Sequence, residues 1–407
     1  MTEVLPLILT QHAEEAAFLW LLRDSAKYAP HYLLWELTRL DNRLEAHLDG
    51  LRIAGDPGWE IIEKQLDAKL GPGEVFVAAL FAFETKQQKR IDKVLEIAAP
   101  VPALRRGVIS ALGWMPQAEA ARHIQKLPAT NAGLRHIGLG AALAHRINPD
   151  LALEKCLNDL DFSIRAYALR VVGIMGYAVW ANHLRRELRS PDLGCRFAAA
   201  WSLARLTGEV AALSELQTIA LAESRYRIQS VNMLVRRMEP AAARRLNLML
   251  ERLPGAERLA IFAAGALGDP AAIPTLLDRM NQTAYARLAG ESFSMITGLN
   301  LAAENMDGPI PPDHKPIPNE DPLDEHVEMD PDENLPWPIL DKVQDWWNKN
   351  RQKYRDGVRY LVGQPLFEET CQAVLSTGYQ RQRAMAALES GIRQPGQPLL
   401  NVTMPQR

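Results

Sequence analysis

The sequence predicts an all-α fold, an α-solenoid of short helical-pair repeats of about 30 residues, with an acidic Pro-rich insertion and a C-terminal helical segment. Three observations predict it. An arginine recurs every 29 to 31 residues, apolar and small residues surround each of these arginines, and the period stops at a proline-rich stretch over 304–338. The chain has 407 residues, of which 47% are hydrophobic and 23% charged, a composition typical of a globular protein with a sizeable core.

The recurring arginines define the period. Their spacings are 30, 30, 31, 31, 31 and 29 residues, and they are Arg105, Arg135, Arg165, Arg196, Arg227, Arg258 and Arg287. Four residues before five of them stand residues that cap helices or accept hydrogen bonds, namely Asn131, Asp161, Asp192, Glu223 and Thr283. We expect a first helix before each arginine-bearing helix, for example at Leu151–Leu157, Ala181–Leu188 and Ala271–Met280. Each unit therefore holds two short helices.

Small residues in the second helix let neighbouring units approach closely, so each unit buries its face against the next. The period is shorter than the roughly 40–47 residues of standard HEAT repeats, and the ankyrin and tetratricopeptide patterns are absent, so we interpret the units as short and HEAT-like. We predict a helical cap with a first diverged repeat (1–55), the repeat array (56–303), the acidic insertion (304–338), C-terminal helices with tryptophans and a last repeat-like unit (339–390), and a loose tail (391–407).

Charge is divided unevenly along the chain. The net charge of −3 excludes a general attraction to nucleic acid or to acidic membranes. Residues 101–260 carry 22 basic and 13 acidic side chains, a net charge of +9, whereas residues 304–338 carry 1 and 11, a net charge of −10, together with nine prolines. Such a stretch buries too little apolar surface to fold by itself, so we expect an extended insertion. We further expect an intramolecular contact of 304–338 with the basic repeats.

The arginine series favours a structural interpretation. An arginine one turn into a helix, bonded to the acceptor four residues earlier or to one in the adjacent unit, would form a structural ladder along the stack. The alternative is that the row of arginines faces a ligand. Candidate partner-binding residues lie outside this register, and they are Arg185, Arg186, Arg236, Arg237, Arg244, Arg245, Trp337, Trp346 and Trp347. Because adjacent residues on a helix point in different directions, we expect only one of the last two tryptophans to pack on the repeats.

Catalytic and metal-binding patterns are missing. The sequence has no H-E-x-x-H, no G-x-S-x-G and no phosphate-binding loop, so we expect no catalytic residues, no metal and no cofactor. Cys156, Cys195 and Cys371 fit no zinc spacing and are typical of reduced, buried thiols. Neither a charged signal region nor an apolar run of about 18 residues is present, which predicts a soluble, cytoplasmic protein without membrane insertion.

Five strings resemble those of a known family. They are Arg39–Gly55, the acidic Met329–Asn334, Asn334–Pro338 together with Trp346-Trp347, Arg359–Gly363, and Thr377–Arg383. They are similar to the strings of a bacterial family of HEAT-like-repeat proteins whose genes lie in or beside type VI secretion clusters, and the resemblance spans essentially the whole chain. It implies a cytoplasmic accessory of that system, an adaptor or chaperone that acts on a spike, an effector or a related component. It supplies no catalytic residues.

These observations predict a non-enzymatic protein-binding scaffold. One alternative is a nucleic-acid-binding HEAT-like protein that uses the basic surface of 101–260, and another is a short-HEAT enzyme, for which no cofactor-holding constellation is present. Aromatic residues that could stack on bases are sparse in the basic span. The sequence therefore favours a protein partner over nucleic acid.

Overall fold

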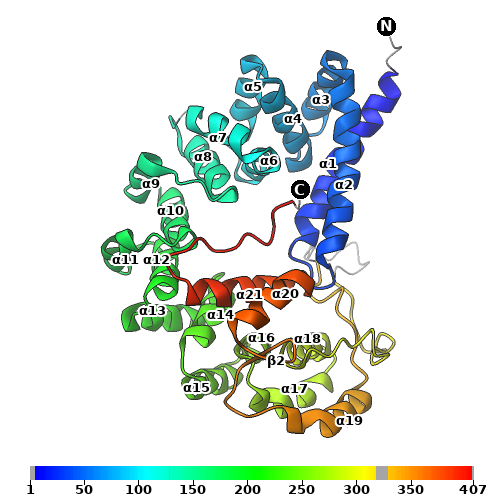
Figure 1. Ribbon diagram of the computed structural model, residues 1–407, viewed down its shortest axis with the longest axis vertical. Coiled ribbons are helices and arrows are strands. Elements are labelled where there is room, and N and C mark those ends of the chain that lie inside the picture. The colour runs from blue at the N-terminus through cyan, green and yellow to red at the C-terminus, as the bar shows by residue number, and fades with distance from the viewer. Residues whose placement is uncertain (1–4, 128, 318–328, 406–407) are drawn as a thin grey trace. The chain divides into compact units, whose positions relative to one another are not determined.

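The computed structural model describes residues 5–127, 129–317 and 329–405. It confirms the all-α class, because the described part of the chain contains 21 α-helices and one hairpin of two short strands, β1 (Tyr360–Leu361) and β2 (Gln364–Pro365) (Figure 1). The chain divides into two compact units. Unit 1 comprises 1–28, 32–202 and 396–407, and unit 2 comprises 29–31 and 203–395. The division falls inside the predicted repeat array, in helix α12 (Leu193–Leu206).

Unit 1 consists of helices that contact their neighbours in sequence and, in alternation, the helix after next. Apart from α12 and the 3-10 turn Ala178–Trp180, its helices are α1 (Pro6–Ala26), α2 (Leu34–Ala54), α3 (Asp56–Ala68), α4 (Pro72–Thr85), α5 (Gln88–Ala98), α6 (Pro102–Trp114), α7 (Gln117–Lys126), α8 (Ala132–Ala144), α9 (Asp150–Leu157), α10 (Phe162–Met175) and α11 (Ala181–Glu187). Helices α4, α6, α8 and α10 contact one another in that order. The core of α1, α4 and α6 contains Trp20 stacked on Phe76, whose ring meets Trp114 edge-on.

The ends of the helices in unit 1 follow the residues that the sequence supplies. The side chains of Asn131, Asp161 and Asp192 accept hydrogen bonds from backbone N–H groups two or three residues later, at the starts of α8, α10 and α12. A cap of this kind satisfies an N–H group that the first turn of a helix leaves without a partner. At the other end, Gly176 ends α10 in the left-handed region, where glycine is least strained.

Glycines set the closest approach between helices in unit 1. A Cβ atom on Gly133, near the start of α8, would lie 2.0 Å from the carbonyl oxygen of Ala99. A Cβ atom on Gly107 in α6 would lie 2.5 Å from the carbonyl oxygen of Pro72. Because both obstacles are backbone atoms, a side chain at either position would push two helices apart.

Unit 2 contains a second series of helices with the same alternating contacts. Its helices are α13 (Val210–Leu221), α14 (Arg227–Arg237), α15 (Pro240–Glu251), α16 (Glu257–Leu267), α17 (Ile273–Met280), α18 (Ala286–Thr297), α19 (Leu340–Asn350), α20 (Glu368–Thr377) and α21 (Gln380–Arg393), with 3-10 turns at Pro270–Ala272 and Arg351–Lys353. Helix α14 contacts α16, which contacts α18. The hairpin joins the ends of two of these helices, since the N–H of Tyr360 donates to Gly268 and the N–H of Val362 to Met295.

Trp346 and Trp347 on α19 both pack inside unit 2. The ring of Phe293 on α18 lies edge-on to both of them, with centroid distances of 6.0 Å and 6.2 Å. The expectation that only one of the pair packs on the repeats therefore differs from the structure. The physical reason is that indole side chains are large enough for two adjacent residues to reach either side of one buried ring.

The C-terminal tail is held by hydrogen bonds. Helix α21 continues to Arg393, beyond the predicted end at 390. Within unit 1, the N–H of Leu399 donates to Ile174, and the guanidinium of Arg146 donates to the carbonyl of Leu399. Arg23 donates to the carbonyl of Thr403 and also pairs with Asp41. These bonds distinguish 396–405 from the loose tail that the sequence predicts.

No helix in the described ranges combines the length and the apolar character that crossing a bilayer requires.

The close approach at Gly133 makes a direct test of the packing in unit 1. We expect Gly133→Ala to lower the free energy of unfolding by about 1–3 kcal/mol, because the new methyl group overlaps a backbone oxygen. Gly138→Ala in the same helix is the matched control, since its Cβ would lie 3.9 Å from the nearest atom outside the helix. This control should be neutral or stabilising by up to about 1 kcal/mol, because alanine favours helix over glycine. Urea denaturation followed by circular dichroism measures both, and equal stabilities would contradict this packing.

Candidate binding groove

The first four arginines of the series bond to the turn that follows the preceding helix. Arg105, Arg165 and Arg196 each donate to the backbone carbonyl six residues earlier, at Ala99, Asp159 and Ser190. Arg135 makes a longer bond of the same kind to Ala129 and also pairs with the carboxylate of Asp159 at 2.7 Å. Ala99 is the C-cap of α5, and the other three acceptors lie in turns, two or three residues beyond the ends of α7, α9 and α11, so each guanidinium bonds its own helix to the turn before it. The residues four positions earlier do not receive these bonds.

The last two arginines of the series have different partners, which lie in the acidic segment. A guanidinium nitrogen of Arg258 lies 2.7 Å from the carboxylate of Asp332. Arg287 donates to the backbone carbonyl of Asp332 at 2.9 Å and pairs with the carboxylate of Asp330. The residues four positions before Arg227 and Arg287 also differ from those in unit 1, because neither Glu223 nor Thr283 caps the following helix.

The end of the acidic segment is a defined local structure. The N–H of Asp332 donates to the carboxylate of Asp330 at 2.9 Å, and the N–H of Leu335 donates to the carbonyl of Asp332. Asp332 is only 3% exposed. The centre of the segment, 318–328, lies outside the described residues. The described end therefore contacts two arginines of unit 2, Arg258 on α16 and Arg287 on α18.

Two other groups surround this end of the segment. The guanidinium of Arg287 lies over the ring of Trp337 at 4.4 Å from its centroid, and His314 meets the same ring edge-on. Burial tends to raise the pKa of Asp330, but the hydrogen bonds from the Asp332 N–H and Arg287, with the charge of Arg287, hold its pKa below the ordinary value. Trp337 thus packs beneath a cation of the same unit.

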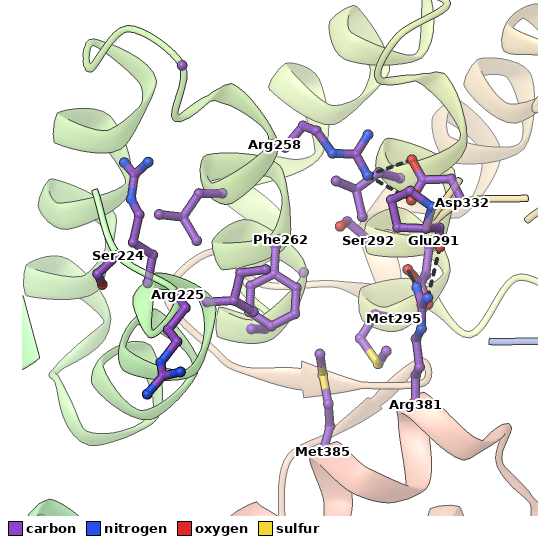
Figure 2. A pocket seen from close by; sticks show the side chains of 18 residues that line it. Ser224, Arg225, Arg258, Phe262, Glu291, Ser292, Met295, Asp332, Arg381 and Met385 are labelled. Atoms are coloured by element: carbon purple, nitrogen blue, oxygen red, sulfur yellow. Dashed lines mark hydrogen bonds and ion pairs between the residues drawn. The ribbon is translucent and has the colours of Figure 1, made fainter. Parts of the chain in front are cut away.

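Beside Asp332 lies a groove of about 590 Å³ in unit 2 (Figure 2). We call it the α14–α21 groove, and it is lined by Ser224, Arg225, Arg227, Ile228, Gly255, Arg258, Leu259, Phe262, Gly265, Ala266, Leu288, Glu291, Ser292, Met295, Pro331, Asp332, Arg381 and Met385. Its floor is apolar, with Phe262, Met295 and Met385 facing the space between the two sides. One side bears Ser224 and Arg225, and the other bears the Arg258–Asp332 and Arg381–Glu291 pairs (Figure 2).

The two sides of the groove differ in electrostatics. On one side, Arg381 pairs with Glu291 at 2.8 Å and donates to the carbonyl of Pro331. Burial raises the pKa of Glu291, and the charge of Arg381 opposes that shift. On the other side, Arg225 is exposed and donates to the hydroxyl of Tyr226, and Arg227 donates to the carbonyl of Ala220. No carboxylate among the described residues lies within ion-pair distance of Arg225 or Arg227.

The partner-binding candidates predicted from the sequence are divided between the two units. Arg185 and Arg186 are exposed on α11 in unit 1, and Arg245 is exposed in unit 2. Arg244 lies 3.4 Å from the buried carboxylate of Asp269, and Arg237 is half-buried.

Arg236, predicted as a partner-binding residue, is buried. It is only 6% exposed, lies 3.2 Å from Glu389, and has a pKa lowered to about 10 by burial, against the attraction of Glu389. It is not an exposed cation, because it faces the interior from the inner side of α14.

Of the seven arginines in the series, Arg227 and Arg258 line the groove. The groove residues Arg225, Phe262, Glu291 and Met385 were not predicted, although Arg225 stands two residues before an arginine of the series and carries a usable signal.

Two further features concern chemistry. In the ranges that the structure describes, no group of three or more His, Cys, Asp or Glu side chains is arranged to hold a metal ion. The three cysteines are buried, and burial raises the pKa of Cys195 to about 12 and that of Cys371 to about 11. A high pKa disfavours the reactive thiolate at neutral pH.

Comparison with protein-family models, with curated proteins and with solved structures finds no match to this chain.

The backbone bonds of the arginine series are testable at Arg165, which makes two hydrogen bonds to the carbonyl of Asp159 at 2.9 Å and 2.6 Å. We expect Arg165→Met to lower the free energy of unfolding by about 1–3 kcal/mol, because the variant loses two charge-assisted bonds to the Asp159 carbonyl in the turn after α9. Arg189→Met, at an exposed position of the same unit, should change it by less than about 0.5 kcal/mol. Urea denaturation separates the two outcomes. A neutral Arg165→Met would show that the arginine series does not stabilise the fold through these bonds.

A pH-dependent contribution is expected from Asp330. Its folded-state pKa lies below the unfolded value of about 3.9, so the carboxylate adds stability above about pH 4 and this stability disappears as the pH falls through the folded-state pKa. Asp330→Asn should therefore be less stable than the parent chain at pH 7, and the difference should shrink at lower pH. Urea denaturation at several pH values measures it, with the exposed Glu333→Gln as the control. A difference that is constant with pH would contradict the Arg287 pairing.

Proposed function

We propose that this chain is a non-enzymatic protein-binding scaffold, and that the α14–α21 groove is its principal binding site. The single observation that carries the proposal is the groove itself, which has a volume of about 590 Å³, an apolar floor and four arginines among its lining residues. Ligand sites in proteins are typically concave and mostly apolar, with a few polar groups that fix orientation. Arginine and aromatic side chains are also the residues that contribute most at protein interfaces.

The proposal includes the repeat architecture. We propose that the helix pairs of each unit are short HEAT-like repeats of an α-solenoid. Two observations support this: the second helices contact one another in order, α4 to α10 in unit 1 and α14 to α18 in unit 2, and equivalent arginines bond to equivalent carbonyls six residues earlier. Repeats that contact only their neighbours form extended surfaces suited to binding other macromolecules.

The partner is proposed from the sequence resemblance. The strings that resemble the type VI secretion-associated family suggest a cytoplasmic adaptor or chaperone for a spike, an effector or a related component. Some of these strings lie near the groove, since Arg381 of the Thr377–Arg383 string lines it and Trp337 packs beneath Arg287. One of the strings therefore contributes a residue to the proposed binding site.

A nucleic-acid-binding function is less well supported by the same geometry. The arginines at 105, 135, 165 and 196, which contribute to the positive charge of 101–260, bond to backbone carbonyls of the preceding turns. Their guanidinium groups therefore bond partly to the backbone and do not form a phosphate-binding stripe. Arg185 and Arg186 are exposed, so a weak attraction for phosphate is the only electrostatic contribution we expect from them.

Affinity purification tests the proposed function. The tagged full-length chain, expressed in a bacterium that carries a type VI secretion cluster, should retain a spike, an effector or a related component of that system, as identified by mass spectrometry. The tag alone is the control. Recovery of no such component would contradict the assignment to secretion. The purified chain should also fail to retard labelled duplex DNA at about 50 mM salt, where phosphate contacts are strongest. Retardation there, without a protein partner, would favour the nucleic-acid alternative.

A further inference from the structure

Two of the four arginines that line the α14–α21 groove form ion pairs with carboxylates, and two form none with the described residues. Arg258 and Arg381 each pair with a carboxylate of unit 2, from Asp332 and Glu291. On the opposite side, no carboxylate among the described residues pairs with Arg225 or Arg227. The groove thus has one neutralised side and one side with an excess of positive charge. A ligand with an anionic group could form, with the arginines of the second side, ion pairs like those of the first side.

The position of Arg225 suits it to recognition. It is exposed in the turn before α14, its guanidinium lies 4.9 Å from the ring centroid of Tyr226, and it donates to the hydroxyl of the same residue. Contact with an aromatic ring restricts the side chain, so less conformational entropy is lost when it binds an anion. No side chain caps the N-terminus of α14, whose partial positive charge lies beside Arg225 and Arg227.

The apolar surface between the two sides requires an apolar partner. Ile228 on α14 is 58% exposed although its side chain is aliphatic, and Phe262 is half-buried at the floor. Met295 and Met385 complete the floor, and flexible methionine side chains adapt to varied apolar groups. A ligand with charge alone would leave this surface uncovered. The groove therefore fits a segment that carries both a carboxylate and an apolar side chain.

We propose that the α14–α21 groove binds an acidic peptide segment of a protein partner, with a carboxylate on Arg225 and Arg227 and an apolar side chain over Ile228, Phe262 and Met385. This inference rests on the proposed scaffold function and names the chemistry that its site recognises. The chain contains an internal example of the same recognition, because Asp330 and Asp332 place two carboxylates and a backbone carbonyl on Arg258 and Arg287.

The neutralised side does not favour a polyanion. Arg258 and Arg381 are already paired with Asp332 and Glu291, so a row of phosphates would find few unpaired cations along the groove. A peptide with one or two carboxylates needs only the cations of the opposite side. The peptide's acidic residues therefore bind at the side of Ser224 and Arg225, seen opposite the two ion pairs in Figure 2.

The test begins with a library of random linear peptides, selected on the immobilised full-length chain. We expect the enriched peptides to share a carboxylate near a Leu, Phe or Met residue. The best peptide is then labelled with fluorescein and titrated by fluorescence polarisation. Its counterpart with Asn and Gln in place of Asp and Glu should bind at least about tenfold more weakly, as should the original peptide at about 0.5 M salt.

Variants assign the binding to the groove. Arg225→Glu should weaken the peptide affinity by about tenfold to a hundredfold, because it replaces a charge-assisted bond with repulsion. Ile228→Asp should also weaken it, through the loss of apolar contact. The matched control is Arg252→Glu, an equal charge change at an exposed position of unit 2 outside the groove, and it should change the affinity by less than about threefold. Thermal melting shows whether each variant is folded.

Three outcomes would overturn the inference. They are enrichment of no peptide, enrichment of peptides without acidic residues, and equal effects of Arg225→Glu and Arg252→Glu. Its failure is distinguishable from failure of the proposed function. If a secretion component is retained equally by Arg225→Glu and the parent chain, the scaffold function stands and the groove assignment is wrong. If no secretion component is retained but the peptide binds through Arg225, the groove assignment stands and the link to secretion is wrong.

Discussion

The pairing of Asp332 with Arg258 and Arg287 determines the form of the α14–α21 groove in unit 2. The Asp332 carboxylate is buried against Arg258, and its backbone carbonyl accepts from Arg287. A carboxylate removed from water in this way is stable only with such partners. The end of the acidic segment is therefore fixed to the first turns of α16 and α18. The neighbouring Pro331 accepts from Arg381, which connects the same segment to α21. The groove depends on these contacts because Pro331 and Asp332 form part of its wall.

This arrangement gives the acidic segment a structural role at its described end. A segment that only screened a basic surface would be held by exposed, solvent-screened pairs. Asp330 and Asp332 are instead joined by a local hydrogen bond and surrounded by Arg287 and Trp337. Their ion pairs are with the last two arginines of the series. The arginines of unit 1 bond instead to backbone carbonyls six residues earlier. Within unit 2, the described contacts of the two carboxylates with the arginine series are those with Arg258 and Arg287.

The sequence predicted features that repeat or that depend on local chemistry. The period of the arginines located the second helices, and Asn131, Asp161 and Asp192 were recognised as caps because a cap is made within four residues. Features that depend on distant contacts were missed. The β1–β2 hairpin bonds to the ends of α16 and α18 through Gly268 and Met295, which nothing near Tyr360 indicates. The groove joins residues from 224 to 385, so its composition follows from packing and not from any single motif.

In the proposed binding mode, the Asp330–Asp332 end is a wall of the groove and leaves the peptide site open. The most direct measurement is the affinity of Asp332→Asn for the acidic peptide selected on the parent chain, by fluorescence polarisation at matched salt. If Asp332 forms a wall, its substitution loosens the groove and the affinity falls, although a negative charge has been removed. If the segment instead competes with the partner for the arginines, the substitution frees Arg258 and the affinity rises, and that result would contradict the account.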